Sequence, residues 1–368
     1  MKSKHRLRDR VQSQDNSFFN ESMIDNYFRE AKSLESTVEK SRIWLESHES
    51  IKDDTGKALN GLNQLSFAIP IFGGSGDEFT IIQPWHHIFF EADQDLDSAI
   101  LLLMMGFYKD SFRSLRSFLE LNIFALYNFV NEDKKYFQKW LNGKAHTPGV
   151  GDMLQKLIEK SVDFKKLNEK LDWNKEVRSL YKELSGFMHT QGALHTHTSL
   201  RNSNTTSFSE TGIQTGTELL LRAIRLASMG FAVNFPMSFQ ALPLFEKFAL
   251  SPPVGGFLDE GQVESVKSIF SDEVSKKLSD ICLANEDANS LAEGVRSMSN
   301  QTKEEIFESF KRTLESEEFK TSKEKILQMI KDDEFDKAIA LVTATQRAVI
   351  RAMNGILFNP FYMSKNSK

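Results

Sequence analysis

The sequence predicts an all-α protein, and three observations support this fold class. The chain of 368 residues contains only 8 prolines and 19 glycines, and long helices tolerate little of either residue. In several segments the apolar residues recur every three or four positions, as they do on one face of a helix. No segment sustains the alternation of apolar and polar residues that a half-buried β-strand needs.

The first 84 residues are expected to form a flexible tail followed by a helical extension of the main domain. Residues 1–17 are basic and precede no apolar stretch, which is typical of a mobile tail rather than a secretory signal. Residues 18–48 carry apolar residues at helical spacing and predict an amphipathic helix. In the remainder of the 18–84 extension, DDTG and PIFGGSGDEF predict loops, with LSFAIPIF between them as a short extended piece.

Residues 85–250 are expected to form a helical bundle. Its clearest helix is predicted over about 109–130, where six large apolar residues step by three or four positions. They are Phe112, Leu115, Leu119, Ile123, Leu126 and Val130. The other helices predicted here cover 85–106, a short segment around Tyr136 and Trp140, 152–161, 173–189, 217–234 and 237–249. Between 191 and 216, a segment rich in Ser, Thr, Asn and Gly predicts a long loop.

The segment SPPVGG at 251–256 is the best candidate for a linker between this bundle and a second part of the chain. Beyond it, aromatic residues become rarer and charged residues more frequent, and a smaller helical region is expected over 257–368. Its predicted helices cover 258–284, 302–318, 321–331 and 334–357.

Composition narrows the class of protein. The net charge of −5 argues against a strongly basic nucleic-acid-binding protein, although a local basic patch is compatible with it. Because Cys282 is the only cysteine, no internal disulfide can form, and the cytoplasm is the expected location. No apolar run is long enough to span a bilayer, so we expect no membrane association.

The sequence contains no motif for a cofactor or a metal, and we expect neither. GGSG at 73–76 lacks the lysine and the spacing of phosphate-binding loops, and one cysteine excludes cysteine-rich zinc sites. Two groupings leave a metal site open as an alternative, namely His87 with Glu91 and His195 with His197. A solvated first helical turn and a polar loop explain these groupings more simply.

Polar residues form a narrow strip on each of two predicted helices. At 100° per residue, Arg113, Arg116 and Glu120 lie within about 60° of one another, beside the apolar face of the 109–130 helix. Tyr181, Ser185 and His189 form a similar strip beside the apolar face of the 173–189 helix. Two antiparallel helices that pack by their apolar faces would join both strips into one groove.

Such a groove would hold the residue types needed for metal-independent cleavage of RNA. Arginine binds phosphate through a planar fork, and histidine transfers protons near neutral pH. In this interpretation His189 activates the 2′-hydroxyl, while Arg113 and Arg116 stabilise the charge that develops around phosphorus. Glu120, Tyr181 and Ser185 would orient these groups.

A structural role explains the same residues without any chemistry. Arg116 and Glu120 are four residues apart and can form an ion pair that fixes a bundle. A histidine at the end of a helix is favoured by the helix dipole whatever its function. Tyr181 and Ser185 can serve to satisfy buried backbone groups.

Two segments resemble a known family. GFYKDSFRSLRSFLELNIFALY at 106–127 contains the pattern R-x-x-x-E, and LYKELSGFMHTQG at 180–192 contains Y-x-x-L-S-x-x-x-H. These patterns resemble those of bacterial helical proteins of unknown function, which look related to HEPN domains. The resemblance covers about residues 85–190 and implies a HEPN-like bundle of four or five helices. Many HEPN proteins are ribonucleases of toxin–antitoxin and phage-defence systems.

The chain departs from the motif of active HEPN ribonucleases, which is an arginine, four to six residues and then a histidine on one helix. Ten residues separate Arg178 from His189, and the spacing of Arg42 and His48 is a match that chance alone predicts about once. Two functions therefore remain open. The first is a toxin- or defence-type ribonuclease, or a binder of RNA or nucleotide. The second is a non-catalytic helical interaction module that forms a homodimer or binds a partner protein.

Overall fold

The computed structural model describes residues 33–69, 86–131, 133–200, 207–248, 256–302, 304–305, 308 and 323–332. Within these ranges every regular element is a helix, apart from one isolated bridge between Ala241 and Leu258. The all-α fold class is therefore confirmed for the described part of the chain. The predicted tail at 1–17, the predicted helix at 334–357 and most of the one at 302–318 lie outside the described residues.

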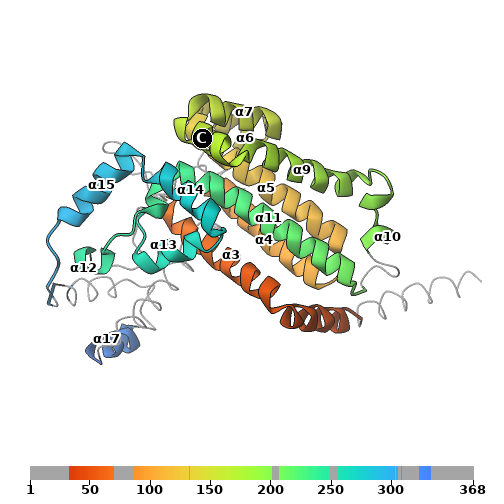
Figure 1. The fold of residues 1–368 in the computed structure, drawn as a ribbon, viewed down its shortest axis with the longest axis horizontal. Helices are drawn as coiled ribbons and strands as arrows, with labels where there is room; N and C mark the ends of the chain where they lie inside the picture. The colour runs from red at the N-terminus through yellow and green to blue at the C-terminus, as the bar shows by residue number, and fades with distance from the viewer. Residues whose placement is uncertain are drawn as a thin grey trace, which may run out of the picture.

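The helices follow one another along the chain (Figure 1). After a helix over 33–47 they are α3 (Glu49–Ala68), α4 (His86–Met104), α5 (Tyr108–Asn131), α6 (Lys134–Leu141), α7 (Val150–Lys160), α8 (Val162–Leu171), α9 (Trp173–His189), η1 (Ala193–His195), α10 (His197–Leu200), α11 (Glu210–Asn234), η2 (Pro236–Phe239), α12 (Leu244–Phe248), α13 (Glu260–Lys267), α14 (Asp272–Cys282), α15 (Glu286–Ser297) and α17 (Lys323–Lys331).

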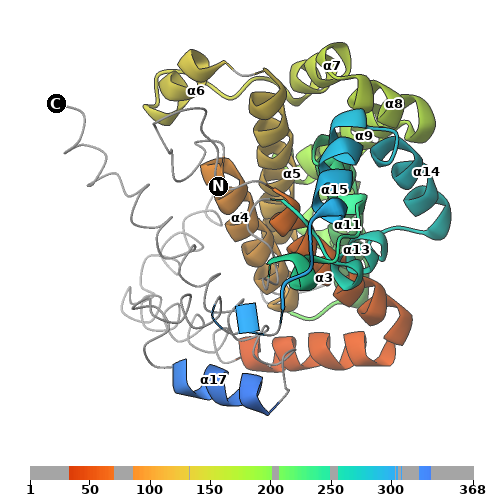
Figure 2. The ribbon, with the colours of Figure 1, turned by 90° about the vertical axis from the view of Figure 1, so that its left-hand side faces the viewer.

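Helix α5 is the centre of the bundle and packs against α4, α7, α9 and α11. Its apolar stripe faces the core, where Phe112, Leu119 and Ile123 are fully buried. Figure 1 shows α4, α5 and α11 running side by side. Figure 2 shows α6 and α7 at one end of α5.

The loop predicted after residue 48 is wrong, because residues 49–68 form helix α3. Gly61 faces α13, and a Cβ atom there would lie 2.4 Å from the carbonyl oxygen of Ser265 and 2.3 Å from Cγ1 of Ile269. The glycine is thus needed for close helix packing and does not mark a turn. The role of Gly61 is determined by a contact across some 200 residues, which the local sequence does not show.

The long loop predicted over 191–216 is also shorter than expected. Helix α11 already begins at Glu210, where the Ser209 side chain caps it by accepting a hydrogen bond from the Gly212 N–H. The Tyr108 hydroxyl fixes this start, since it accepts a bond of 2.8 Å from the Ser209 N–H. Gly212 and Gly216, which suggested a loop, leave room for the side chains of Tyr108 and Leu103.

The hydrophobic core continues past the segment at 251–256. Val263 on α13 and Ile281 on α14 belong to the same buried cluster as the core residues of α5 and α11. The helix predicted over 258–284 is divided into α13 and α14, and α15 follows, capped by Asn285. The predicted helix at 321–331 corresponds to α17.

Candidate functional site between α5 and α9

Helices α5 and α9 pack in opposite directions through their apolar faces. Near the beginning of α5, Lys109 contacts Thr190 just beyond the end of α9. One turn further along α5, the rings of Phe112 and Phe187 meet edge to face with centroids 4.7 Å apart. This register brings the two polar strips to the same edge of the interface, which we call the polar edge.

Four of the six predicted residues meet at the polar edge and form what we call the Arg116 cluster: Arg116, Glu120, Tyr181 and Ser185. The Arg116 guanidinium donates from Nε to the Ser185 hydroxyl at 3.0 Å and from Nη2 to the Tyr181 hydroxyl. Nη2 also lies 3.3 Å from the Glu120 carboxylate. In addition, the guanidinium carbon lies 4.5 Å from the centroid of the Tyr181 ring, within cation–π range.

The Tyr181 hydroxyl connects the positive and negative members of the cluster. It accepts a hydrogen bond from Arg116 and donates one of 3.1 Å to Glu120. Burial raises the pKa of this phenol, and the Glu120 carboxylate acts in the same direction. Tyr181 therefore keeps its proton at neutral pH and can hold both partners. The Arg116 and Glu120 side chains are 20% and 25% exposed, so solvent still reaches the cluster.

The other two predicted residues, Arg113 and His189, do not contact the Arg116 cluster directly. Arg113 is exposed, and its guanidinium pairs with Asp110 at 2.5 Å. His189 is the last residue of α9 and is exposed, one helical turn beyond Ser185. No hydrogen bond links His189 to Arg116 within the described ranges. The register places Arg113 across from the segment between Ser185 and His189.

Sequence reasoning missed Lys109, which is one turn before Arg113 on the same strip of α5. Its side chain is only 4% exposed, and its ammonium group donates to the Thr190 hydroxyl. Thr190 ends α9 in the left-handed conformation, with φ +52°. The one-turn spacing from Arg113 was a usable signal in the sequence, but the burial depends on how α9 ends.

The segment after α9 folds back over the end of that helix. The His195 imidazole lies on Gly186, where a Cβ atom would come within 2.6 Å of the ring. The same ring meets Phe187 edge to face at 4.8 Å, and its Nδ1 is 2.7 Å from the Gln191 carbonyl oxygen. Gly186 therefore allows a close approach, and His195 has a packing role at the end of α9.

The structure does not assemble the metal sites that the histidine groupings left open. His87 Nδ1 lies 4.0 Å from the Glu91 carboxylate, and burial lowers the pKa of this imidazole. In the ranges that the structure describes, no group of three or more histidine, cysteine, aspartate or glutamate residues is arranged to hold a metal ion. No helix in those ranges is both long and apolar enough to cross a membrane.

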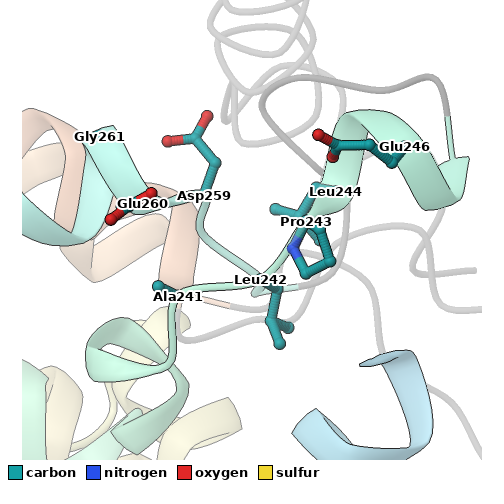
Figure 3. Close-up of a pocket in the computed structure, with 8 residues that line it drawn as sticks. All are labelled: Ala241, Leu242, Pro243, Leu244, Glu246, Asp259, Glu260 and Gly261. Atoms are coloured by element: carbon teal, nitrogen blue, oxygen red, sulfur yellow. The ribbon is translucent and has the colours of Figure 1, made fainter. Parts of the chain in front are cut away.

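A separate pocket of about 430 Å³ lies away from the polar edge, between the segment before α12 and the start of α13 (Figure 3). Its lining residues are Ala241, Leu242, Pro243, Leu244, Glu246, Asp259, Glu260 and Gly261. Asp259 already acts as the N-cap of α13, in a reciprocal capping box with Gln262. The pocket offers carboxylates but no group that identifies a ligand.

Comparisons with protein families, with curated proteins and with solved structures found no match to this chain. The HEPN resemblance therefore stays a prediction from the two sequence patterns, and a functional proposal must depend on the geometry of the polar edge.

Proposed function

We propose that the protein is a metal-independent ribonuclease that binds the RNA backbone at the polar edge, with His189 as the group that transfers the proton. The observation that carries the proposal is the state of the Arg116 guanidinium. Its Nε and Nη2 atoms are held by Ser185, Tyr181 and Glu120, whereas Nη1 has no hydrogen-bond partner among the described residues. The cluster thus fixes the guanidinium and leaves one edge of it to bind phosphate.

The neighbouring side chains supply the remaining requirements for RNA cleavage. His189 is exposed one turn from Ser185, and an imidazole there can accept the proton of a 2′-hydroxyl. The 2′-oxygen then attacks phosphorus and the bond to the 5′-oxygen breaks, with the leaving oxygen taking a proton from solvent. Arg113 and Arg116 stabilise the negative charge of the transition state. The products are a 2′,3′-cyclic phosphate and a 5′-hydroxyl end.

The test is cleavage of single-stranded RNA by the purified protein in the presence of a metal chelator. His189→Gln should reduce the cleavage rate by about a hundredfold or more, the usual contribution of a general base. Its melting temperature should stay unchanged, because the His189 side chain is exposed and makes no hydrogen bond in the described structure. His146→Gln is the matched control, since His146 is an exposed histidine in the loop before α7.

Equal rates for the wild type and His189→Gln would refute the proposed role of His189. If the wild type does not cleave the RNA and forms no 2′,3′-cyclic phosphate, the proposal that the protein is a ribonuclease is refuted.

One observation favours a second function, a non-catalytic helical interaction module. Glu120 already neutralises Arg116 inside the cluster, as expected of an interaction that only locks α5 to α9. If this is the whole role, His189→Gln changes nothing measurable, while Arg116→Met lowers stability without any effect on RNA. Analytical ultracentrifugation would then show whether the module forms homodimers.

A further inference from the structure

A second polar cluster lies at the far end of α5, where α6 and α7 meet it. We call it the Tyr127 cluster: Tyr127, Asn131, Tyr136, Lys156 and Lys160. Asn131 donates to the Tyr127 hydroxyl at 3.0 Å and accepts a hydrogen bond from the Lys160 ammonium group. The Tyr127 phenol is close enough to Lys156 and Tyr136 to act electrostatically on both. The two phenols and two lysines are thus gathered in one place.

The Tyr127 cluster and the Arg116 cluster lie on the same strip of α5. At 100° per residue, Arg116, Glu120, Tyr127 and Asn131 fall within about 60° of one another. Fifteen residues separate Arg116 from Asn131, which corresponds to about 22 Å along the helix at 1.5 Å per residue. One extended ligand lying along this strip would contact both clusters.

Arg178 occupies the α9 side of the path between the two clusters. It is three residues before Tyr181, in the direction of the Tyr127 cluster, and it is exposed. Its guanidinium donates to the Gly151 carbonyl oxygen at 2.7 Å, and a Cβ atom on Gly151 would lie 2.5 Å from Nη1. Gly151 therefore lets Arg178 join α9 to the first turn of α7, which adds a positive charge to the path.

The charge around the Tyr127 cluster is opposite to that of the whole chain. Residues 134–170 contain nine lysines and four acidic residues, a net charge of +5 in a chain whose net charge is −5. Among the described residues, Lys135, Lys139, Lys144 and Lys160 form no ion pair, so their charges remain available to a partner. A local field of this sign attracts polyanions.

Aromatic rings accompany these lysines. Tyr136 and Trp140 are half-buried and pack against Phe124, with the Trp140 and Phe124 centroids 4.9 Å apart. Aromatic rings that remain partly exposed are the platforms on which proteins stack the bases of single-stranded nucleic acid. Lysines alone would fit any acidic partner, but lysines with aromatic rings along a strip favour single-stranded RNA.

We infer that the Tyr127 cluster is a second RNA-binding subsite, which binds a backbone phosphate through Lys160 and stacks bases near Tyr136 and Trp140. Lys156, which pairs with Glu159 at 2.9 Å, lies beside it. The inference rests on the proposed function in taking RNA as the ligand and in placing the scissile phosphate at the Arg116 cluster. It adds that the protein binds one strand over the length of α5, so that affinity depends on the length of the RNA.

The experiment measures binding of fluorescently labelled single-stranded RNA carrying 2′-O-methyl groups, which cannot be cleaved. Two lengths are compared, about four and about twelve nucleotides, within the range of known single-strand sites. Lys160→Gln removes the charge and retains a donor for Asn131, and Lys160→Ala removes both. Lys57→Ala on α3 is the control, because Lys57 is exposed, forms no ion pair in the described structure and lies on a helix at the opposite end of the bundle from α7 (Figures 1 and 2).

Both Lys160 variants should weaken binding of the longer RNA by about threefold to tenfold and reduce its salt slope by about one, as loss of one phosphate contact predicts. Binding of the short RNA should change by less than about twofold, and Lys57→Ala should leave both unchanged. The inference is overturned if the Lys160 variants weaken binding of both RNA lengths equally, or if they weaken binding of neither. The inference is also overturned if polyglutamate or an anionic vesicle, at equal charge, displaces the labelled RNA as well as unlabelled RNA does.

The outcomes separate this inference from the proposed function. If Lys160 affects binding of only the longer RNA but no RNA is ever cleaved, the subsite stands and the ribonuclease proposal fails. If His189→Gln abolishes cleavage but the Lys160 variants bind the longer RNA like the wild type, the ribonuclease stands and the subsite fails.

Discussion

The contact between Arg116 and Tyr181 can be tested by a double-mutant cycle, which isolates its energy from the effects of the single substitutions. Arg116→Met keeps the aliphatic volume and removes the guanidinium. Tyr181→Phe keeps the ring and removes the hydroxyl that joins Arg116 to Glu120. The cycle is completed by the double variant, and the coupling is the deviation from additivity.

The structure sets the expected magnitudes. Arg116→Met removes the bonds to Tyr181 and Ser185, a 3.3 Å ion pair with Glu120 and the cation–π contact. A hydrogen bond to a charged group contributes about 1.5–3 kcal/mol net, and the 20% exposure of Arg116 favours the lower part of that range for the whole set. We therefore expect a loss of about 2 kcal/mol. Tyr181→Phe should cost about 1 kcal/mol, and the coupling should be about 0.5–1.5 kcal/mol.

The assay is urea unfolding followed by far-ultraviolet circular dichroism, with equal m-values required for all four proteins. Coupling below about 0.3 kcal/mol would be ordinary additivity, and it would refute the claim that Arg116 and Tyr181 act as one unit. Ser185→Ala is a useful further variant, because it removes a single acceptor from the same guanidinium. It should cost less than Tyr181→Phe, since the Tyr181 hydroxyl also holds Glu120.

Two further predictions concern the helices that support the site. Gly56→Ala and Gly61→Ala make the same change five residues apart on α3. The first should stabilise the protein by about 1 kcal/mol, because nothing lies within 4 Å of the new methyl group. The second should destabilise it by about 1–3 kcal/mol, because the methyl group would overlap Ser265 of α13 and Ile269 just after that helix. Equal effects of the two substitutions in urea unfolding would contradict this packing. Burial raises the pKa of the Cys282 thiol, which is 1% exposed. The folded protein therefore keeps the thiol proton that the unfolded chain loses above about pH 8.5, and stability should fall by up to about 1.4 kcal/mol per pH unit above that point. Cys282→Ala should lack this fall between pH 8 and 10, and identical slopes for both proteins would refute it.

The parts of the fold that were predictable are those whose signal is local. The apolar stripe at 109–130 defined α5 to within a residue, because every third or fourth position must be buried in any helix at the centre of a bundle. The same arithmetic placed Arg116 and Tyr181 on strips beside their apolar faces. Their contact then followed from packing those faces together, and the structure shows it.

The parts that were not predictable depend on distant partners. Gly56 in DDTG and Gly212 belonged to segments predicted as loops, yet both lie inside helices, α3 and α11, and Gly212 allows the close approach of Tyr108. Lys109 was not singled out, because its burial depends on its contact with Thr190 at the end of α9. His195 gave no sign of lying over Gly186, because nothing local indicates that the chain turns back after α9.

The two proposed roles of the Arg116 cluster need not compete, because a cluster that fixes an arginine also prepares it for a ligand. A free arginine loses side-chain entropy when it binds phosphate, whereas Arg116 has already been ordered by Tyr181 and Ser185. The entropy of the Arg116 side chain is therefore lost when the protein folds, and Nη1 can still donate a hydrogen bond to a phosphate oxygen. Glu120 opposes binding by lowering the net charge, so Glu120→Gln should strengthen RNA binding severalfold if phosphate approaches this edge. A purely structural cluster would show lower stability and unchanged affinity instead, and that result would leave Arg116 as a lock between two helices.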